Sequence, residues 1–140
     1  IKKDKNFVIG EKTAEQIKIT IGSAYATDET MDICGRNLVT GLPSEVTVNG
    51  SEIHDALSEH FQSIVDNIKI ILERTPPEIS SDIYKSGLYL TGGSSRIQDL
   101  GQFIYDELGL KVNLCEEPES TVIMGLGAVI EDPQLAKLAL

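Results

Sequence analysis

The sequence predicts an α/β fold with a partly parallel sheet in its second half. A short apolar run at residues 88–91 stops at the glycine pair Gly92-Gly93, which is typical of a buried strand that ends in a tight turn. Apolar residues at helical spacing follow, and a second short strand is predicted at residues 111–114, before another helical pattern near residues 120–130. Strands that alternate with helices are typical of this fold class.

The first fifty residues predict a helix and a β-hairpin. Thr13 and Gln16 fit a capping box and predict a helix from about Ala14 to Ile21, which Gly22 ends. A polar loop follows at residues 26–30. Two partly alternating segments, 31–39 and 44–48, then flank turn residues, which indicates a small antiparallel hairpin.

A long helix is predicted from a cap at Ser51 to Arg74, where Thr75 and two prolines break the pattern. We expect one apolar stripe along this helix to be buried, so that Ile64→Asp would cost several kcal/mol of stability. The stripe consists of Ile53, Leu57, Phe61, Ile64, Ile68 and Ile71.

The second half predicts a short helix at residues 77–86 and a longer one at 95–108, each followed by one of the two strands. The pattern divides the chain into an outer lobe, residues 1–74, and an α/β lobe, residues 75–140. The long helix is expected to join the two.

The composition predicts a soluble intracellular chain. Among 140 residues, 22 are acidic and 12 basic, and the formal net charge of −10 disfavours nonspecific binding to nucleic acid and anionic lipid. No apolar run approaches the roughly 18 residues of a membrane span. Cys34 and Cys115 lack metal-ligand spacing and are expected to be reduced packing residues. Because the chain begins at Ile1 rather than Met, we expect it to be a piece of a longer protein.

The glycine turn is the first candidate binding element. Gly92 and Gly93 lack the Cβ atoms that keep a ligand from the backbone, and a helix that starts after them exposes unpaired N–H groups. A plain strand-to-helix connector remains the alternative. Glu15 and Lys18, three residues apart on one predicted helix, could reach a common ligand, or could form an ordinary surface ion pair.

Other patterns argue against several kinds of chemistry. His54 and His60 do not have the i, i+4 spacing that presents two imidazoles to one metal. Ser94 and Ser95 lack the flanking glycine of a nucleophile elbow. Glu116-Glu117 is interpreted as a solvated acidic turn, and neither a Walker A motif nor G-x-G-x-x-G occurs. No catalytic or metal-binding residue is assigned.

Five sequence blocks, matching in order and spacing, closely resemble the MreB family, the bacterial actin homologues that determine rod shape. The most specific block is GRNLVTGLP at residues 35–43; the others are residues 9–18, 21–24, 75–78 and 90–93. The resemblance covers nearly the whole chain. It implies an actin-like ATPase (ribonuclease H-like) half-domain, the later half of the family's second domain, with a small helix-plus-hairpin outer lobe.

The resemblance also implies a nucleotide site. Thr91, Gly92, Gly93 and Ser94 would form the adenosine motif, with Ile97 beside it. Glu15 and Lys18 would approach the ribose and adenine from the outer lobe. Residues 117–127 resemble the second connecting segment of the family, whose helix start faces the nucleotide.

The chain departs from the family pattern in two places. Ser94-Ser95-Arg96-Ile97 replaces the usual further glycine and small apolar residues, and resembles heat-shock chaperone ATPases, so the residue that stacks on the base stays open. The actin-type phosphate loops, in which Asp-x-Gly precedes small and hydroxyl residues, are absent from the sequence. Metal binding and water activation are therefore expected upstream, outside this chain.

The resemblance implies a cytoskeletal ATPase that binds ATP or ADP with Mg²⁺ and self-associates into filaments. Such filaments would lie in the cytoplasm at the membrane surface and act with the cell-wall elongation machinery; nucleic acid is not an expected partner. The isolated chain is expected to bind nucleotide weakly and to lack ATPase activity. The alternatives are a chaperone-type ATPase of the actin superfamily and a non-hydrolytic actin-fold adaptor module.

Overall fold

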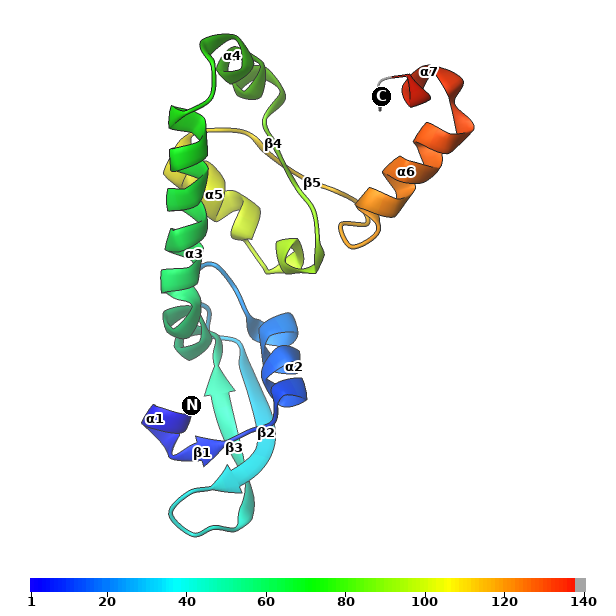
Figure 1. Ribbon diagram of the computed structural model, residues 1–140. Helices are drawn as coiled ribbons and strands as arrows, with labels where there is room; N and C mark the ends of the chain where they lie inside the picture. The colour runs from blue at the N-terminus through cyan, green and yellow to red at the C-terminus, as the bar shows by residue number, and fades with distance from the viewer. Residues whose placement is uncertain (138–140) are drawn as a thin grey trace.

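The computed structural model describes residues 1–137 and contains two small sheets joined by one long helix (Figure 1). In chain order its elements are α1 (Lys2–Lys5), β1 (Phe7–Val8), α2 (Glu11–Ile21), β2 (Thr30–Asn37), β3 (Pro43–Asn49), α3 (Gly50–Glu73), α4 (Pro77–Ser86), β4 (Leu88–Leu90), the 3₁₀ turn η1 (Gly93–Arg96), α5 (Leu100–Leu108), β5 (Val112–Leu114), α6 (Thr121–Glu131) and α7 (Pro133–Ala136).

The predicted hairpin is confirmed. β2 and β3 pair antiparallel, with Ile33 opposite Val46, and the Thr47 hydroxyl donates to Asp32 Oδ1 across the strands at 2.5 Å. β1 adds a third, antiparallel strand beside β2, so the order is β1-β2-β3. β1 was not predicted from the sequence, because a strand of two residues has no periodicity to detect.

Helix α2 begins three residues earlier than predicted. Its N-cap is Gly10, which has no side-chain acceptor, and Thr13 lies inside the helix, so the predicted capping box of Thr13 and Gln16 was wrong. The predicted end is confirmed, since Gly22 is the C-cap and donates its N–H to Lys18 O at 3.1 Å. Ile17 and Ile21 are buried against the three-stranded sheet.

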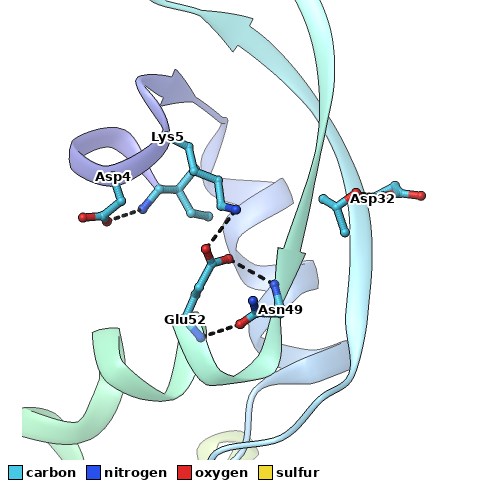
Figure 2. A network of polar contacts seen from close by, with 7 residues as sticks. Asp4, Lys5, Asp32, Asn49 and Glu52 are labelled. Atoms are coloured by element: carbon cyan, nitrogen blue, oxygen red, sulfur yellow. Dashed lines mark hydrogen bonds and ion pairs between the residues drawn. The ribbon is translucent and has the colours of Figure 1, made fainter.

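The cap of α3 is Asn49, not Ser51 as predicted. The Glu52 N–H donates to Asn49 Oδ1 at 2.8 Å, and the Asn49 N–H donates to Glu52 Oε2 at 3.1 Å (Figure 2). Lys5 Nζ lies 2.9 Å from Glu52 Oε1, which connects α1 to the start of α3. Ser51 instead donates its hydroxyl to the carbonyl oxygen of Thr27.

Helix α3 takes part in both hydrophobic cores. Ile53 belongs to the core under the three-stranded sheet, while Phe61 and Val65 belong to a second core with α5. The predicted burial of Ile64 is wrong, because its side chain is 40% exposed and Val65 is fully buried in its place. Ile71, at the end of the predicted stripe, is 65% exposed. Neighbouring helical residues point about 100° apart, so a one-residue error moves a side chain off the buried face.

The second half contains the predicted parallel pair, since β4 and β5 run parallel with Leu88 opposite Val112. Helix α4 has the predicted bounds. Gly87, between α4 and β4, has φ +84°, and a Cβ there would lie 2.5 Å from the carbonyl oxygen of Lys111. β4 is less buried than predicted, because Tyr89 is exposed and both flanking leucines are only half-buried.

The helix predicted at residues 95–108 is interrupted. Gly93–Arg96 forms a 3₁₀ turn, and α5 starts only at Leu100 because Asp99 takes a left-handed conformation with φ 59°. Leu100 and Ile104 are buried against α3. Helix propensity could not reveal this break, because the apolar spacing continues unbroken through it.

Helices α6 and α7 extend away from the rest of the molecule in Figure 1. α6 matches the predicted helix near residues 120–130 to within one residue. Its apolar side chains are mostly exposed, among them Val122, Ile123, Met124, Leu126 and Ile130.

Neither cysteine is in a disulfide, but the expectation that both are packing residues is wrong for Cys34, which is exposed on β2. Within residues 1–137, no helix is long and apolar enough to cross a membrane. The same residues contain no cluster of three His, Cys, Asp or Glu side chains placed to hold a metal ion.

Candidate functional site

A cavity of about 570 Å³ lies where α2 faces the turn after β4. Its volume is within the usual range of small-molecule sites, about 300 to 1,000 Å³. Five of the seven predicted nucleotide contacts line it, namely Glu15, Lys18, Gly93, Ser94 and Ile97. Residues from separate parts of the sequence therefore meet at one cavity.

Thr91 and Gly92 do not line this cavity, but their hydrogen bonds to Pro118 fix the conformation of the turn that does. The Thr91 hydroxyl donates to the Pro118 carbonyl oxygen at 2.8 Å, and the Gly92 N–H donates to the same oxygen at 2.6 Å. Gly92 has φ 84° and ψ 158°, a region essentially restricted to glycine. The Ser95 hydroxyl closes the turn by donating to the Gly92 carbonyl oxygen at 2.7 Å.

The other wall belongs to α2. Glu15 is exposed and Lys18 half-buried, and both side chains line the cavity. Among the described residues, no ion pair joins these two side chains, so the surface pair considered as the alternative does not form. A carboxylate can accept hydrogen bonds from ligand hydroxyls, and an ammonium can donate to ligand acceptors.

Two charged lining residues were missed in the sequence. Arg96 Nε lies 3.0 Å from Glu119 Oε1, and Arg96 Nη2 donates to Glu119 Oε2 at 3.3 Å. Arg96 lies in the stretch that departs from the family pattern, which was the available signal. No local pattern pairs it with Glu119, 23 residues later.

Contacts beside the cavity hold its two walls together. Ser23, fully buried, forms a parallel bridge with Gln98 and donates its hydroxyl to Asp99 Oδ2 at 3.4 Å. The Ala24 N–H donates to the Gln98 carbonyl oxygen at 2.9 Å. The end of α2 is thus attached to the segment between η1 and α5.

The cavity carries balanced formal charge, since Lys18 and Arg96 oppose Glu15 and Glu119. Another cavity, of about 520 Å³, lies between α1 and α3; its lining contains three carboxylates, Asp4, Glu52 and Asp55, and the ammonium of Lys5, but none of the predicted nucleotide contacts. Asp99-Leu100-Gly101 has the Asp-x-Gly spacing of an actin-type phosphate loop but no other feature of that loop. Asp99 caps α5 and bonds Ser23, and Gln102 follows instead of a small or hydroxyl residue.

Comparison with protein families gives a match to the MreB/Mbl protein model over residues 1–138. The cell shape-determining protein Mbl of Bacillus subtilis is 40% identical over 134 residues, which are 94% of this chain and 40% of Mbl. The cell shape-determining protein MreB of Escherichia coli is 40% identical over 133 residues, 94% of this chain and 38% of MreB. The chain therefore spans about two fifths of the length of these relatives.

Solved structures show the same arrangement of elements. Spiroplasma citri MreB5 bound to AMPPNP superposes with a TM-score of 0.88 and 33% identity, covering 99% of this chain and 42% of MreB5. The ADP-bound form of that protein gives a TM-score of 0.87 and 34% identity over 92% of this chain and 40% of MreB5. The MamK double helical filament, 19% identical with a TM-score of 0.68, shows likeness of fold alone.

Proposed function

The chain belongs to the MreB/Mbl family, and from this premise we propose that it forms part of an actin-like, filament-forming cytoskeletal protein that determines rod cell shape by organising cell-wall synthesis. Its α/β fold is the actin-like half-domain expected from the sequence. The observation that carries the proposal is the cavity in which Glu15 and Lys18 face Gly93, Ser94 and Ile97.

We propose that this cavity holds the nucleoside part of ATP or ADP. Solved MreB5 structures bound to ADP and to AMPPNP support nucleotide binding in the family. Glu15 would accept a hydrogen bond from a ribose hydroxyl, and Lys18 would donate one to the ribose or the base. Gly93, Ser94 and Ile97 would line the facing wall. Thr91 and Gly92 would contribute by keeping the turn in its conformation against Pro118.

The phosphates and Mg²⁺ are proposed to bind to a longer polypeptide that carries this chain. The chain spans about two fifths of its relatives, and the exposed apolar side chains of α6 offer a surface for further protein to cover. We propose that the complete protein is cytoplasmic and self-associates into filaments at the membrane surface, where it acts with the cell-wall elongation machinery.

The test compares the longer polypeptide with the isolated 140-residue chain. Calorimetric titration with Mg-ATP should give a saturable site in the longer polypeptide and no tight site in the isolated chain, and only the longer polypeptide should pellet as filaments in a nucleotide-dependent way. A longer polypeptide that neither binds nucleotide nor pellets contradicts the proposed function. Submicromolar affinity or turnover by the isolated chain contradicts the assignment of the phosphate machinery to another segment.

A further inference from the structure

The ion pair between Arg96 and Glu119 lies in the wall of the candidate nucleotide cavity. It joins η1 to the residues just before α6, and the two side chains meet through two nitrogen–oxygen contacts at 3.0 and 3.3 Å. About half of each side chain is exposed. Exposed pairs contribute little to stability, typically about 0 to 1 kcal/mol. We therefore expect this pair to add little to the free energy of unfolding.

The pair supplies two of the four charged side chains in the cavity lining. With both residues present, two cations and two carboxylates line the cavity, so its formal charge is zero. Without Glu119 the lining would carry one net positive charge, and without Arg96 one net negative charge. Glu119 engages Arg96 through Nε and Nη2, which leaves further guanidinium N–H groups to donate to a ligand.

We infer that Arg96 and Glu119 determine the specificity of this cavity: Glu119 neutralises and positions the Arg96 guanidinium, so that the cavity accepts the uncharged nucleoside and gives no advantage to phosphate. Arg96 donates hydrogen bonds to base or ribose acceptors, and Glu119 acts as a positioning residue. This inference rests on the proposed nucleotide site and adds two residues that local sequence patterns did not identify.

The test measures the affinities of adenosine and ADP for the longer polypeptide and compares their ratio between variants. Glu119→Gln should strengthen ADP relative to adenosine by about three- to tenfold, because an unpaired Arg96 attracts the diphosphate. Arg96→Gln should shift the ratio the opposite way and weaken adenosine as well. The double variant Arg96→Glu/Glu119→Arg restores neutrality and should return the ratio to within about twofold of wild type.

A matched control removes the same charge elsewhere. Glu107 pairs with Lys69 at 3.5 Å on the surface between α3 and α5, outside the cavity lining, so Glu107→Gln should leave the ratio unchanged. A ratio that stays constant in all variants while wild type binds ADP would overturn the inference alone. A wild type that binds neither ligand would overturn the proposed function and the inference together. If the Arg96 and Glu119 variants lower the melting temperature and weaken binding of adenosine and ADP equally, the pair is only structural and the inference is overturned.

Discussion

The hydroxyl of Tyr25 donates a hydrogen bond to Oδ2 of Asp106, which attaches the loop after α2 to helix α5 across 81 residues of sequence. The Tyr25 ring also packs edge-on against Phe103, with ring centroids 6.1 Å apart. The backbone N–H of Tyr25 donates to Ser23 Oγ. This hydrogen bond to Asp106, reinforced by desolvation and by nearby carboxylates, raises the pKa of Tyr25 to about 12.

The first prediction concerns this pKa. Because the folded value lies above the ordinary value of about 10, the contribution of the bond to stability is complete below pH 10 and is lost as pH rises through 12. An absorbance titration should show one late tyrosine ionisation that Tyr25→Phe removes. Asp106→Asn should move it to lower pH. A late step that persists unchanged in the Asp106 variant would contradict the assignment.

The second prediction separates two neighbouring residues of α3. Val65 is fully buried, so Val65→Asp places an unpaired charge in the core and should cost about 3 kcal/mol or more. Ile64→Asp, on a side chain that is 40% exposed, should cost about 1 kcal/mol or less. Urea unfolding of both variants checks the difference. Equal losses would show that the helix has a different buried face.

The third prediction concerns the start of α3. The Lys5 ammonium lowers the pKa of Glu52, the Asn49 N–H lowers it further, and desolvation opposes both. A lowered folded pKa means that this stabilisation is present above the ordinary value, about 4.3, and is lost as pH falls through the folded value. Asn49→Ala should cost about 1 kcal/mol at neutral pH.

Glu52→Gln should weaken the fall in stability below about pH 4.3, as measured by urea unfolding at a series of pH values. Glu59→Gln, at an exposed position on the same helix, is the control. If stability falls equally below about pH 4.3 in wild type and in the Glu52 variant, the ionised Glu52 carboxylate drawn in Figure 2 does not contribute to stability.

The fourth prediction tests the α2 wall of the cavity in the longer polypeptide. Glu15→Ala/Lys18→Ala should lower nucleotide affinity about tenfold or more, because each truncation removes a charge-assisted hydrogen bond. The free energy of unfolding should change by less than about 1 kcal/mol. Glu11→Ala/Lys12→Ala, on exposed residues of the same helix, should change neither quantity much. Nucleotide affinity equal to wild type in the first variant would remove Glu15 and Lys18 from the site.

Much of the candidate site was predictable because its parts carry local signals. The turn after β4 needs a glycine at Gly92, where φ is 84°, and Glu15 and Lys18 share one helix face. The sequence could not show that both parts line one cavity. That depends on the contacts of Ser23 and Ala24 with Gln98 and Asp99, more than seventy residues later.

The sequence by itself determined the hairpin, helix α4, the parallel strand pair and the end of α2 at Gly22, because periodicity, proline and glycine act within a few residues. Tertiary structure decided that Val65 rather than Ile64 is buried and that Asp99 interrupts a continuous apolar pattern. It also decided that Ser51 bonds Thr27 rather than capping α3, and that Arg96 meets Glu119. Each of these outcomes depends on a partner distant in sequence, and local propensity contains no information about such partners.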